Sequence, residues 1–376
     1  MNFTILGAGK TGRGFLARLV QEAGQVPVLL DSSLSLITTL RDQGQYTIEF
    51  FGRERPDLTL QVPKAYHTEE PEALEAIAQA DILLVSVGAS NLEQAGSLIK
   101  AALDKRTETN PLLIITAENA INPAMKLNKA IRMTSGQNEA TKTDSLSFLV
   151  TEAAIFCSTI EKPGSAVDIL SEAYDQLPYD ALKAGSLYAL PSSFVPEMQF
   201  PLLLTRKIYT YNCSSAAIAY LGSYLGYAWY ADAANDPRII RVLDALYGKI
   251  NRVLCKAYAI DSQEQEQFAV SAKHKFQNQN IRDSIERNAR DVMRKLAPDE
   301  RLVGPLLLAE QQKLEIEPLE LVIAAAIWYA LQQNEQAVSS RYKQEGVAGL
   351  VPQLPNAMIQ RIETHLRAFQ TRTKEL

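Results

Sequence analysis

The chain has 376 residues, of which 47% are hydrophobic and 22% charged, and its formal net charge is -5. This length allows two domains and a large core, and the weak negative charge excludes a general attraction for nucleic acid or an anionic membrane. The three cysteines, Cys157, Cys213 and Cys255, fit no metal-binding spacing and indicate buried thiols in a reducing compartment. The longest apolar helical stretch, 319–331, is too short to span a bilayer. We therefore expect a cytoplasmic protein.

The N-terminal residues carry a dinucleotide-binding pattern. A short apolar run, Phe3–Leu6, predicts a buried strand, a helix is expected from Gly12 onward, and G-x-G-x-x-G stands between them. Gly7 permits a tight turn, Gly9 lets a pyrophosphate approach the backbone, and Gly12 lets the helix pack closely on the strand. The helix N-terminus then faces the anion. In this loop we expect cofactor contacts from Gly7, Ala8, Gly9, Lys10, Thr11, Gly12 and Arg13.

An acidic residue follows the second apolar run, Val26–Leu30. A carboxylate at Asp31 can accept hydrogen bonds from a ribose diol and would repel a 2′-phosphate. The sequence therefore predicts NAD, and not NADP, as the cofactor.

Strands and helices alternate through the first half of the chain, which predicts a doubly wound, mostly parallel sheet of the Rossmann type. The expected strands are Phe3–Leu6, Pro27–Leu30, Tyr46–Phe51, Asp81–Val87, Leu112–Thr116 and Leu146–Val150. The expected helices are Gly12–Ala23, Leu34–Gln43, Glu70–Ala78, Leu92–Leu103 and Ala120–Lys129. Because the carboxyl ends of parallel strands line the cofactor crevice, we also expect contacts there from Val87, Gly88, Glu118 and Asn119.

The second half predicts an all-helical domain. Pro191, Pro196 and Pro201 interrupt the chain where the composition changes, so the expected domains are 1–192 and 193–376, with the active site between them. Apolar residues at helical spacing predict helices over Leu202–Leu225, Pro237–Tyr258, Ser262–Lys275, Ile281–Leu296, Leu302–Gln311, Glu317–Gln333 and Pro355–Thr373.

The three histidines, His67, His274 and His365, stand beside no evident nucleophile or ligand set. This argues against a histidine-based hydrolase and a zinc enzyme, and no metal site is expected. The acid/base group of a hydride transfer is then expected to be a lysine near the domain junction, because an apolar crevice lowers the pKa of an amine towards neutrality.

The segment 206–216 (RKIYTYNCSSA) resembles the K-x4-N-x2-H active-site segment of the polyol-specific long-chain dehydrogenases, the mannitol dehydrogenase family. Further matches occur in the same order along nearly the whole chain: 7–15, 115–119, 219–222, 275–278, 287–290, 294–296 and 299–302. The resemblance implies that Lys207 is the general acid/base and that Asn119 and Asn212 hold the carbonyl or alkoxide oxygen. On an α-helix Lys207 and Asn212 would lie about 140° apart, so they would converge only if the lysine curls around.

Two departures from the family pattern concern the substrate. Ser215 stands where the family has a histidine, and a serine can hydrogen-bond to a hydroxyl but carries no charge near neutral pH. The family's V-D-R-[IV]-x-P signature is also lost, with Phe156 and Cys157 in the places of the acid and the arginine.

A phosphate-binding stripe is predicted in the second domain. Arg287, Arg290 and Arg294 would share one face of a helix, and guanidinium groups suit phosphate. The alternative is a solvated face on which Asp283, Glu286 and Asp291 neutralise the arginines. The family's dehydrogenases for phosphorylated mannitol carry a similar R-x2-R-x3-R-K-L stretch, which favours phosphate. The expected substrate-binding residues are Lys275, Asn278, Arg287, Arg290, Arg294, Lys295 and Ser215.

The resemblance therefore implies an NAD-dependent oxidoreductase that interconverts a sugar-alcohol phosphate and a ketose phosphate, with mannitol 1-phosphate and fructose 6-phosphate as first choice. The alternatives are a reductase of a hexuronate or an unphosphorylated polyol, and a nucleotide-binding sensor that has lost turnover. The expected partner is a small-molecule substrate, and the expected state is a monomer or homodimer.

Overall fold

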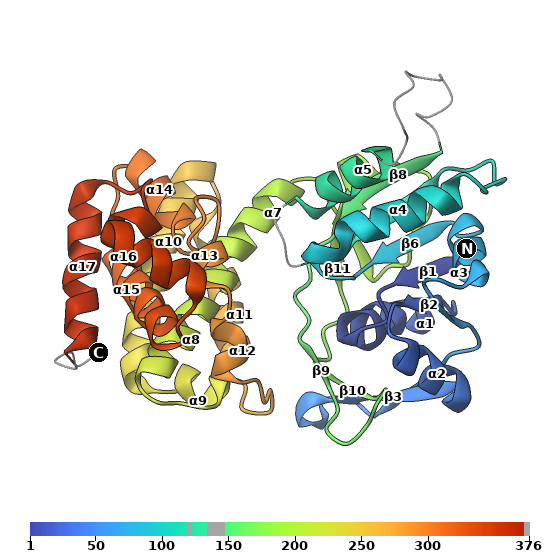
Figure 1. Ribbon diagram of the computed structural model, residues 1–376, viewed down its shortest axis with the longest axis horizontal. Helices are drawn as coiled ribbons and strands as arrows, with labels where there is room; N and C mark the ends of the chain where they lie inside the picture. Colours follow the sequence, from blue (N-terminus) through green and yellow to red (C-terminus); the bar gives the residue numbers. More distant parts are fainter. Residues whose placement is uncertain (119–121, 134–146, 372–376) are drawn as a thin grey trace. The chain divides into compact units, whose positions relative to one another are not determined.

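The computed structural model describes residues 1–118, 122–133 and 147–371. The chain folds into two compact units, Met1–Pro201 and Leu202–Leu376 (Figure 1). The first is built on parallel strands and the second is helical, as the sequence predicts. The division falls a few residues beyond the change of composition near residue 192.

Six strands form the main sheet of the first unit, in the order β5-β2-β1-β6-β7-β8. Their bounds are Phe3–Leu6 (β1), Val28–Asp31 (β2), Ala65–His67 (β5), Ile82–Val85 (β6), Leu112–Thr116 (β7) and Phe148–Glu152 (β8). Every neighbouring pair is parallel. The chain moves outward from β1 in one direction and then outward from β6 in the other, which is the Rossmann order. Its switch point lies between β1 and β6, and ligands of such sheets bind there, beyond the carboxyl ends of the strands.

Helices cover both faces of this sheet (Figure 1). They are η1 (Gly12–Ala17, π-helical), α1 (Arg18–Glu22), α2 (Leu34–Gln43), α3 (Pro71–Ala78), α4 (Leu92–Leu103) and α5 (Pro123–Met133). Because side chains alternate along a strand, Ile5 packs in the same cluster as Phe15 of η1, whereas Leu6 packs in another cluster with Ile99 of α4. Two buried layers thus hold the sheet at the base of the nucleotide loop.

A second, four-stranded sheet has the order β4-β3-β10-β9. It contains β3 (Gln45–Phe50), β4 (Leu58–Gln61), β9 (Thr159–Glu161) and β10 (Ile169–Ser171). The expectation that the strand near Tyr46 joins the doubly wound sheet is therefore wrong. Its residues alternate between buried and less buried positions, which is typical of a strand with one solvated face and not of a central parallel strand. The short strand β5, which was not predicted, takes the edge position in the main sheet.

Smaller elements complete the first unit. They are η2 (Phe51–Arg53), η3 (Ala89–Asn91), β11 (Leu177–Asp180), α6 (Ala181–Ala184) and β12 (Phe194–Glu197). Strands β11 and β12 pair in parallel as a separate two-stranded sheet.

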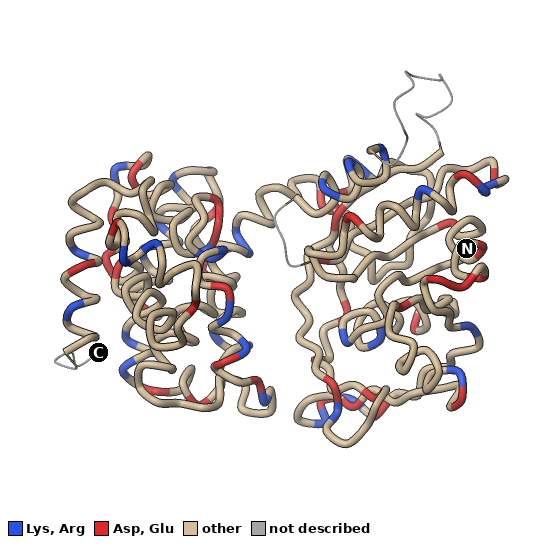
Figure 2. The backbone as a smooth tube through the Cα atoms, in the orientation of Figure 1, with Lys and Arg blue, Asp and Glu red and all other residues tan. Residues whose placement is uncertain are grey.

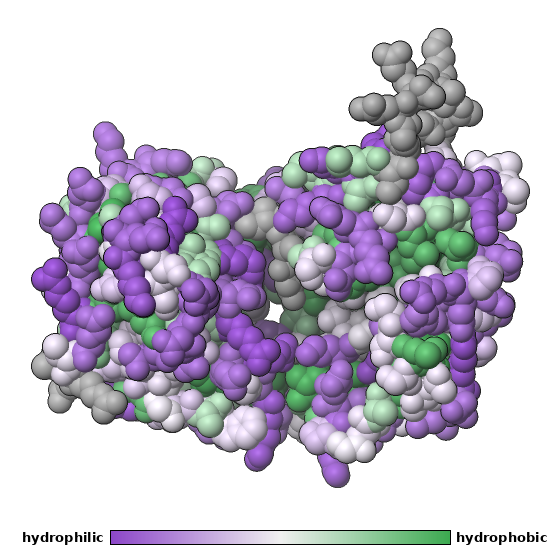
Figure 3. All heavy atoms as spheres, in the orientation of Figure 1, coloured by the Kyte–Doolittle hydropathy of each residue, from purple (hydrophilic) through white to green (hydrophobic). Residues whose placement is uncertain are grey.

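The second unit packs its helices around one large apolar cluster. The segment begins with the end of α7 (Phe200–Lys207) and continues as η4 (Ile208–Asn212), α8 (Cys213–Tyr224), α9 (Tyr230–Ala234), α10 (Pro237–Tyr258), α11 (Ser262–Gln277), α12 (Ile285–Ala289), α13 (Val292–Lys295), α14 (Gly304–Gln311), α15 (Glu317–Gln332), α16 (Gln336–Leu350) and α17 (Asn356–Gln370). Helix α15 is buried on most sides, with residues 322–327 inside the cluster. The face of this unit shown in Figure 3 is largely hydrophilic.

The single helix predicted over Ile281–Leu296 is wrong. The chain forms two short helices, α12 and α13, separated by Arg290 in an extended conformation and by Asp291 in the left-handed region (φ 62°). Helix α16 was not predicted, because it has few buried apolar residues and Gly346 (φ 65°) breaks its regular conformation.

The close packing of the glycine loop is directly testable. A Cβ on Gly12 would lie 2.0 Å from the carbonyl oxygen of Gly7, whereas a Cβ on Gly9 would meet nothing within 4 Å. We expect Gly12→Ala to lower the free energy of unfolding of the first unit by about 1–3 kcal/mol, because the helix must move off the strand. Gly9→Ala is the matched control and should leave stability unchanged in denaturant titrations. Equal stability of both variants would contradict the packing role of Gly12.

Candidate active site

The glycine loop follows β1 and has the geometry that the motif predicts. Gly7 adopts φ +97°, and a Cβ there would lie 2.2 Å from the carbonyl oxygen of Ser86. The N–H groups of Gly7 and Ala8 both donate to the carbonyl of Leu30 on β2, at 2.8 and 3.0 Å. The turn is thus fixed against the two neighbouring strands. The open space at Gly9 leaves its backbone approachable, as a bound pyrophosphate requires.

A cavity of about 470 Å³ lies at this edge of the main sheet. Its lining includes Gly7, Gly9, Asp31, Ser86 and Val87. The Asp31 carboxylate stands at the end of β2, where its Oδ1 accepts a hydrogen bond from the N–H of Ser33 at 2.8 Å. The glycine loop, the acidic residue and the end of β6 therefore surround one hollow, which is the arrangement a dinucleotide needs.

Glu118 holds the loop that follows β6. Its Oε1 accepts a hydrogen bond from the N–H of Gly88 at 2.8 Å, and Gly88 has φ +87°. Burial raises the pKa of Glu118, although the N–H groups of Gly88 and Val87 favour its charged form. The structure therefore brings Glu118 and Gly88 together. Asn119, expected to contact both cofactor and substrate, lies outside the described residues.

Arg13, expected as a cofactor contact, points into the protein. It is 1% exposed, and its guanidinium donates to the carbonyls of Ala8 at 2.5 Å and Val167 at 3.1 Å. Burial lowers its pKa. The Arg13 side chain thus supports the glycine loop from the protein interior, because it donates to backbone carbonyls of the loop and of Val167.

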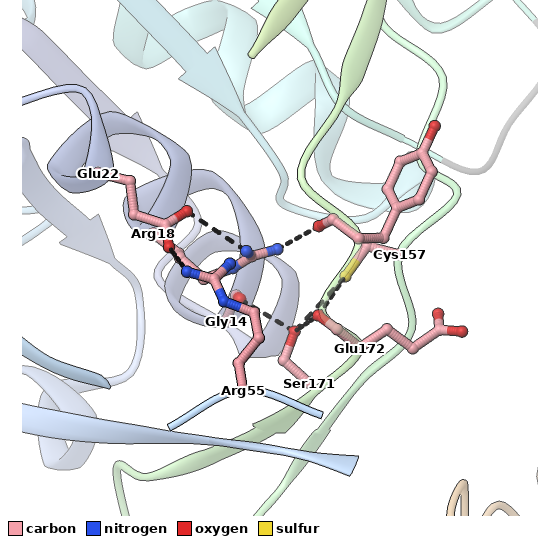
Figure 4. A network of polar contacts seen from close by, with 8 residues as sticks. Gly14, Arg18, Glu22, Arg55, Cys157, Ser171 and Glu172 are labelled. Carbon is pink, nitrogen blue, oxygen red and sulfur yellow. Dashed lines mark hydrogen bonds and ion pairs between the residues drawn. The ribbon is translucent and has the colours of Figure 1, made fainter. Parts of the chain in front are cut away.

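Cys157, one of the two residues where the family signature is lost, belongs to a network of polar contacts in the first unit (Figure 4). Arg18 is fully buried, lies 5.7 and 5.5 Å from the ring centroids of Phe15 and Phe50, and donates to the carbonyl of Tyr174. In the same network the Sγ of Cys157 lies 3.5 Å from the Oγ of Ser171. Cys157, in the place of the family's arginine, therefore packs beneath the first helix.

In the second unit, Lys207 and Asn212 are brought onto one face by a π-helical turn. The segment η4 runs from Ile208 to Asn212, and the N–H of Cys213 donates to the carbonyl of Ile208, five residues earlier. A turn with i→i+5 hydrogen bonds holds more residues than an α-helical turn, so residues five apart are separated by a smaller angle. The expected separation of about 140°, which assumes an α-helix, is therefore too large for this segment.

The Lys207 amine is buried among other cations. Lys207 is 5% exposed. This burial, followed by the charges of Arg301 and Lys275, lowers the pKa of Lys207 to about 7. The preceding residue, Arg206, is anchored differently: it donates to Gln265 at 2.9 Å and pairs with Glu264 at 2.6 Å. Arg206 is thus fixed by a carboxylate, whereas the pKa of the adjacent Lys207 is lowered by burial and neighbouring cations.

Basic and acidic positions are interspersed along the backbone of the helical unit (Figure 2). The three stripe arginines are paired with carboxylates. The ion pairs are Arg287–Asp283 at 2.9 Å, Arg290–Glu286 at 3.2 Å, Arg294–Asp291 at 3.6 Å and Arg294–Glu300 at 2.9 Å. The alternative expectation named these same partners Asp283, Glu286 and Asp291, and this pairing is confirmed. The expected shared helix face does not exist, because the helix is interrupted at Arg290 and Asp291.

The remaining expected substrate contacts lie at several places in the helical unit. Lys295 is 4% exposed, donates to the carbonyl of Asn288 at 2.6 Å and lies 5.2 Å from the ring centroid of Tyr220. Burial, then the charges of Arg301 and Arg294, lower its pKa to about 7. Lys275 is in the last turn of α11, and Asn278 ends that helix with its side chain accepting from the N–H of Asn280. Ser215 follows Asn212 by three residues on α8.

One residue of this group was missed by the sequence reasoning. Arg301 influences both low-pKa lysines, and the motif 299–302 contained it without assigning it a role. In the described part of the chain, no group of three or more His, Cys, Asp or Glu side chains is arranged to hold a metal ion. Among the same residues no helix combines the length and apolarity needed to cross a membrane.

The strand order, the glycine loop and the cavity define a dinucleotide-binding protein with an attached helical unit. A family model for the mannitol dehydrogenase Rossmann domain matches residues 1–182, and one for the mannitol dehydrogenase C-terminal domain matches residues 203–369. The chain belongs to the mannitol dehydrogenase family.

Similar proteins agree with this assignment. The chain is 27% identical, over 339 residues, to a Brevibacillus brevis protein named mannitol-1-phosphate 5-dehydrogenase, with 89% of this chain and 87% of that protein covered. A protein of the same name from Clostridium acetobutylicum is 26% identical over 348 residues, covering 88% and 87%. The fold is similar to that of Pseudomonas fluorescens mannitol 2-dehydrogenase in a ternary complex with NAD and D-mannitol, with a TM-score of 0.80, 15% identity, and 99% and 92% coverage.

The burial of Lys207 predicts a measurable cost in stability. The pKa of Lys207 is about 7 in the folded protein, whereas an ordinary lysine has a pKa of 10.5. Between pH 7 and 10.5 the unfolded chain therefore binds more protons than the folded one, so the free energy of unfolding should rise with pH over this range. Lys207→Met should reduce this slope, with Lys295 keeping part of it. At neutral pH the variant should also melt higher, by roughly 2–4 °C for each kcal/mol of desolvation removed. Lys249→Met, which removes a surface ion pair, is the control for calorimetry. A lower melting temperature for Lys207→Met alone would contradict the burial cost.

Proposed function

We propose that this protein is an NAD-dependent dehydrogenase that interconverts a sugar-alcohol phosphate and a ketose phosphate, with mannitol 1-phosphate and fructose 6-phosphate as first choice. The observation that carries the proposal is the buried amine of Lys207, aligned with Asn212 by the π-helical turn. The family membership supplies the reaction class, because the relatives bear the names of mannitol and mannitol-1-phosphate dehydrogenases.

The first unit fits the dinucleotide. The unobstructed backbone at Gly9 would receive the pyrophosphate, and Asp31 on the wall of the same cavity would bind the adenosine ribose. Glu118 would keep the Gly88 loop in a fixed position beside the cofactor. Bound NAD supplies the acceptor for a hydride.

The helical unit supplies the proton chemistry. In the oxidation direction the neutral amine of Lys207 removes the hydroxyl proton as hydride leaves the same carbon. In the reduction direction the ammonium form returns that proton to the oxygen. The amide of Asn212, together with that of Asn119, would stabilise the developing oxyanion through donated hydrogen bonds. A lysine whose pKa is about 7 populates both forms near neutral pH, which suits a reversible reaction.

A second candidate is an unphosphorylated polyol as substrate. The pairing of Arg287, Arg290 and Arg294 with their own carboxylates favours it, because these arginines are already neutralised. Parallel turnover measurements with fructose and fructose 6-phosphate distinguish the two candidates. A nucleotide-binding sensor would turn over neither.

Replacement of Lys207 tests the proton role. We expect Lys207→Ala to lower kcat by about 10²–10⁴-fold while the dissociation constant for NAD changes little, because the glycine loop is untouched. In the wild type, oxidation should accelerate as the pH rises through about 7, since the neutral amine is the base, and reduction should slow over the same range. Near-normal turnover of the variant, followed as NADH absorbance, would refute this role.

The cofactor preference rests on Asp31. The wild type should bind NAD more tightly than NADP, and Asp31→Ser should narrow this ratio by roughly tenfold, because a carboxylate no longer faces the 2′-phosphate. Glu72→Gln, an exposed acidic residue in the first turn of α3, controls for the general loss of negative charge. Tighter binding of NADP by the wild type, measured by fluorescence titration, would show that the assignment is wrong.

A further inference from the structure

Arg301 acts on both buried lysines of the helical unit. Beyond the effect of burial, its charge lowers the pKa of Lys207, together with the charge of Lys275, and the pKa of Lys295, where Asp291 and Glu300 oppose the effect. The carboxylate next to Arg301 is that of Glu300, which is 4% exposed. Its Oε1 accepts from Arg294 at 2.9 Å and its Oε2 accepts from Arg301 at 2.9 Å. One carboxylate is therefore shared by two guanidinium groups, with two further buried amines close by.

Arg301 is held by only one side of its guanidinium. The Nε and the backbone N–H both donate to Glu300 Oε2, at 2.9 and 3.3 Å. Its side chain is 14% exposed, and among the described residues no hydrogen bond involves its two terminal nitrogens. A guanidinium that is fixed through Nε keeps its terminal N–H groups for a planar or tetrahedral oxyanion.

The stripe arginines do not have this property. Arg290 and its partner Glu286 are 66% and 76% exposed, so water competes for both groups. Arg287 and Arg294 are about half exposed and each uses terminal nitrogens on a carboxylate. Arg301 is thus the most buried of these four guanidinium groups, and its ion pair with Glu300 engages Nε and leaves both terminal nitrogens to a ligand.

We propose that Arg301, positioned by Glu300, binds the phosphate group of the phosphorylated substrate. This inference rests on the proposed function and deepens it, because it assigns the phosphate specificity to Arg301 in place of the predicted stripe. Lys207 would then act at the reacting hydroxyl while Arg301 holds a remote phosphate of the same molecule. A phosphate dianion bound there would accept hydrogen bonds from the terminal nitrogens of Arg301 that no described residue uses.

Binding measurements on the full-length protein test the proposal without relying on turnover. The probes are fructose 6-phosphate, fructose and inorganic phosphate, each titrated by calorimetry into the NAD-loaded protein. Arg301→Gln should weaken the binding of fructose 6-phosphate and of inorganic phosphate roughly ten- to a hundredfold, and that of fructose less than threefold. The matched control is Arg367→Gln, which removes an exposed arginine whose Nη2 lies 3.8 Å from Oε2 of Glu363. It should leave the affinity for all three probes unchanged.

Two further measurements test the proposal if the Arg301→Gln variant does not fold. Arg301→Lys keeps the charge but not the fork, so it should retain part of the phosphate affinity. In the wild type, inorganic phosphate should compete with fructose 6-phosphate and not with fructose. Equal losses for fructose and fructose 6-phosphate, absence of this competition, or a loss in Arg290→Gln without one in Arg301→Gln would each overturn the proposal.

The outcome also separates this inference from the proposed function. If the wild type binds fructose 6-phosphate through Arg301 but turns over no polyol or ketose, the phosphate site stands and the proposed dehydrogenase function is refuted. If the wild type oxidises mannitol and mannitol 1-phosphate equally well, and Arg301→Gln does not change the ratio of the two rates, the dehydrogenase function stands and the phosphate site is refuted.

Discussion

The burial of one amine, that of Lys207, is the constraint on which the proposed chemistry of the helical unit depends. Burial, followed by repulsion from Arg301 and Lys275, lowers the pKa of this amine. The neighbouring Arg206 is paired with Glu264. Burying the Lys207 amine lowers the free energy of unfolding, and the surrounding core, in which α8 and α15 are buried on most sides, offsets that loss. A large apolar cluster can hold an unfavourable polar group in place.

The nucleotide loop, unlike the Lys207 site, is stabilised by close backbone packing and satisfied hydrogen bonds. Gly7 and Gly12 leave no room for a side chain, and the loop amides are bonded to Leu30 of β2. Arg13 supports the loop from within by bonding the carbonyl of Ala8. The loop therefore has its shape from contacts within the first unit, and a ligand that binds it loses little free energy in ordering it.

Sequence reasoning recovered those parts of the fold whose signals are local. The glycine motif, the four-residue apolar strands and long helices such as Pro237–Tyr258 depend on spacing within one segment. It failed where a tertiary partner decides. The strand near Tyr46 looked like one more strand of the parallel sheet, although its alternation already indicated a half-solvated strand. The break at Arg290 and Asp291 has no glycine or proline to announce it.

The candidate site shows the same limit. The family resemblance identified Lys207 and Asn212, but an ideal α-helical wheel separates them, and only the observed π-helical turn gives their pairing a geometric reason. Arg301 was overlooked because nothing in its spacing distinguishes it from a surface arginine. Its significance comes from its burial, from the contact of its Nε with Glu300, and from its action on Lys295 and on Lys207, which is distant in sequence.

The overall charge of the chain and the local charge of the site have opposite signs, and this contrast bears on the substrate. The whole chain is acidic, with a net charge of -5, whereas the pKa of Lys207 is lowered by burial and then by the cations Arg301 and Lys275. Replacement of the family's histidine by Ser215 adds no negative charge to this region. A field of this kind is concentrated where water is excluded, because screening by solvent is weakest there. An uncharged polyol gains nothing from such a field, whereas a phosphate monoester is attracted by it. This local charge is our reason for proposing the phosphorylated member of the substrate pair.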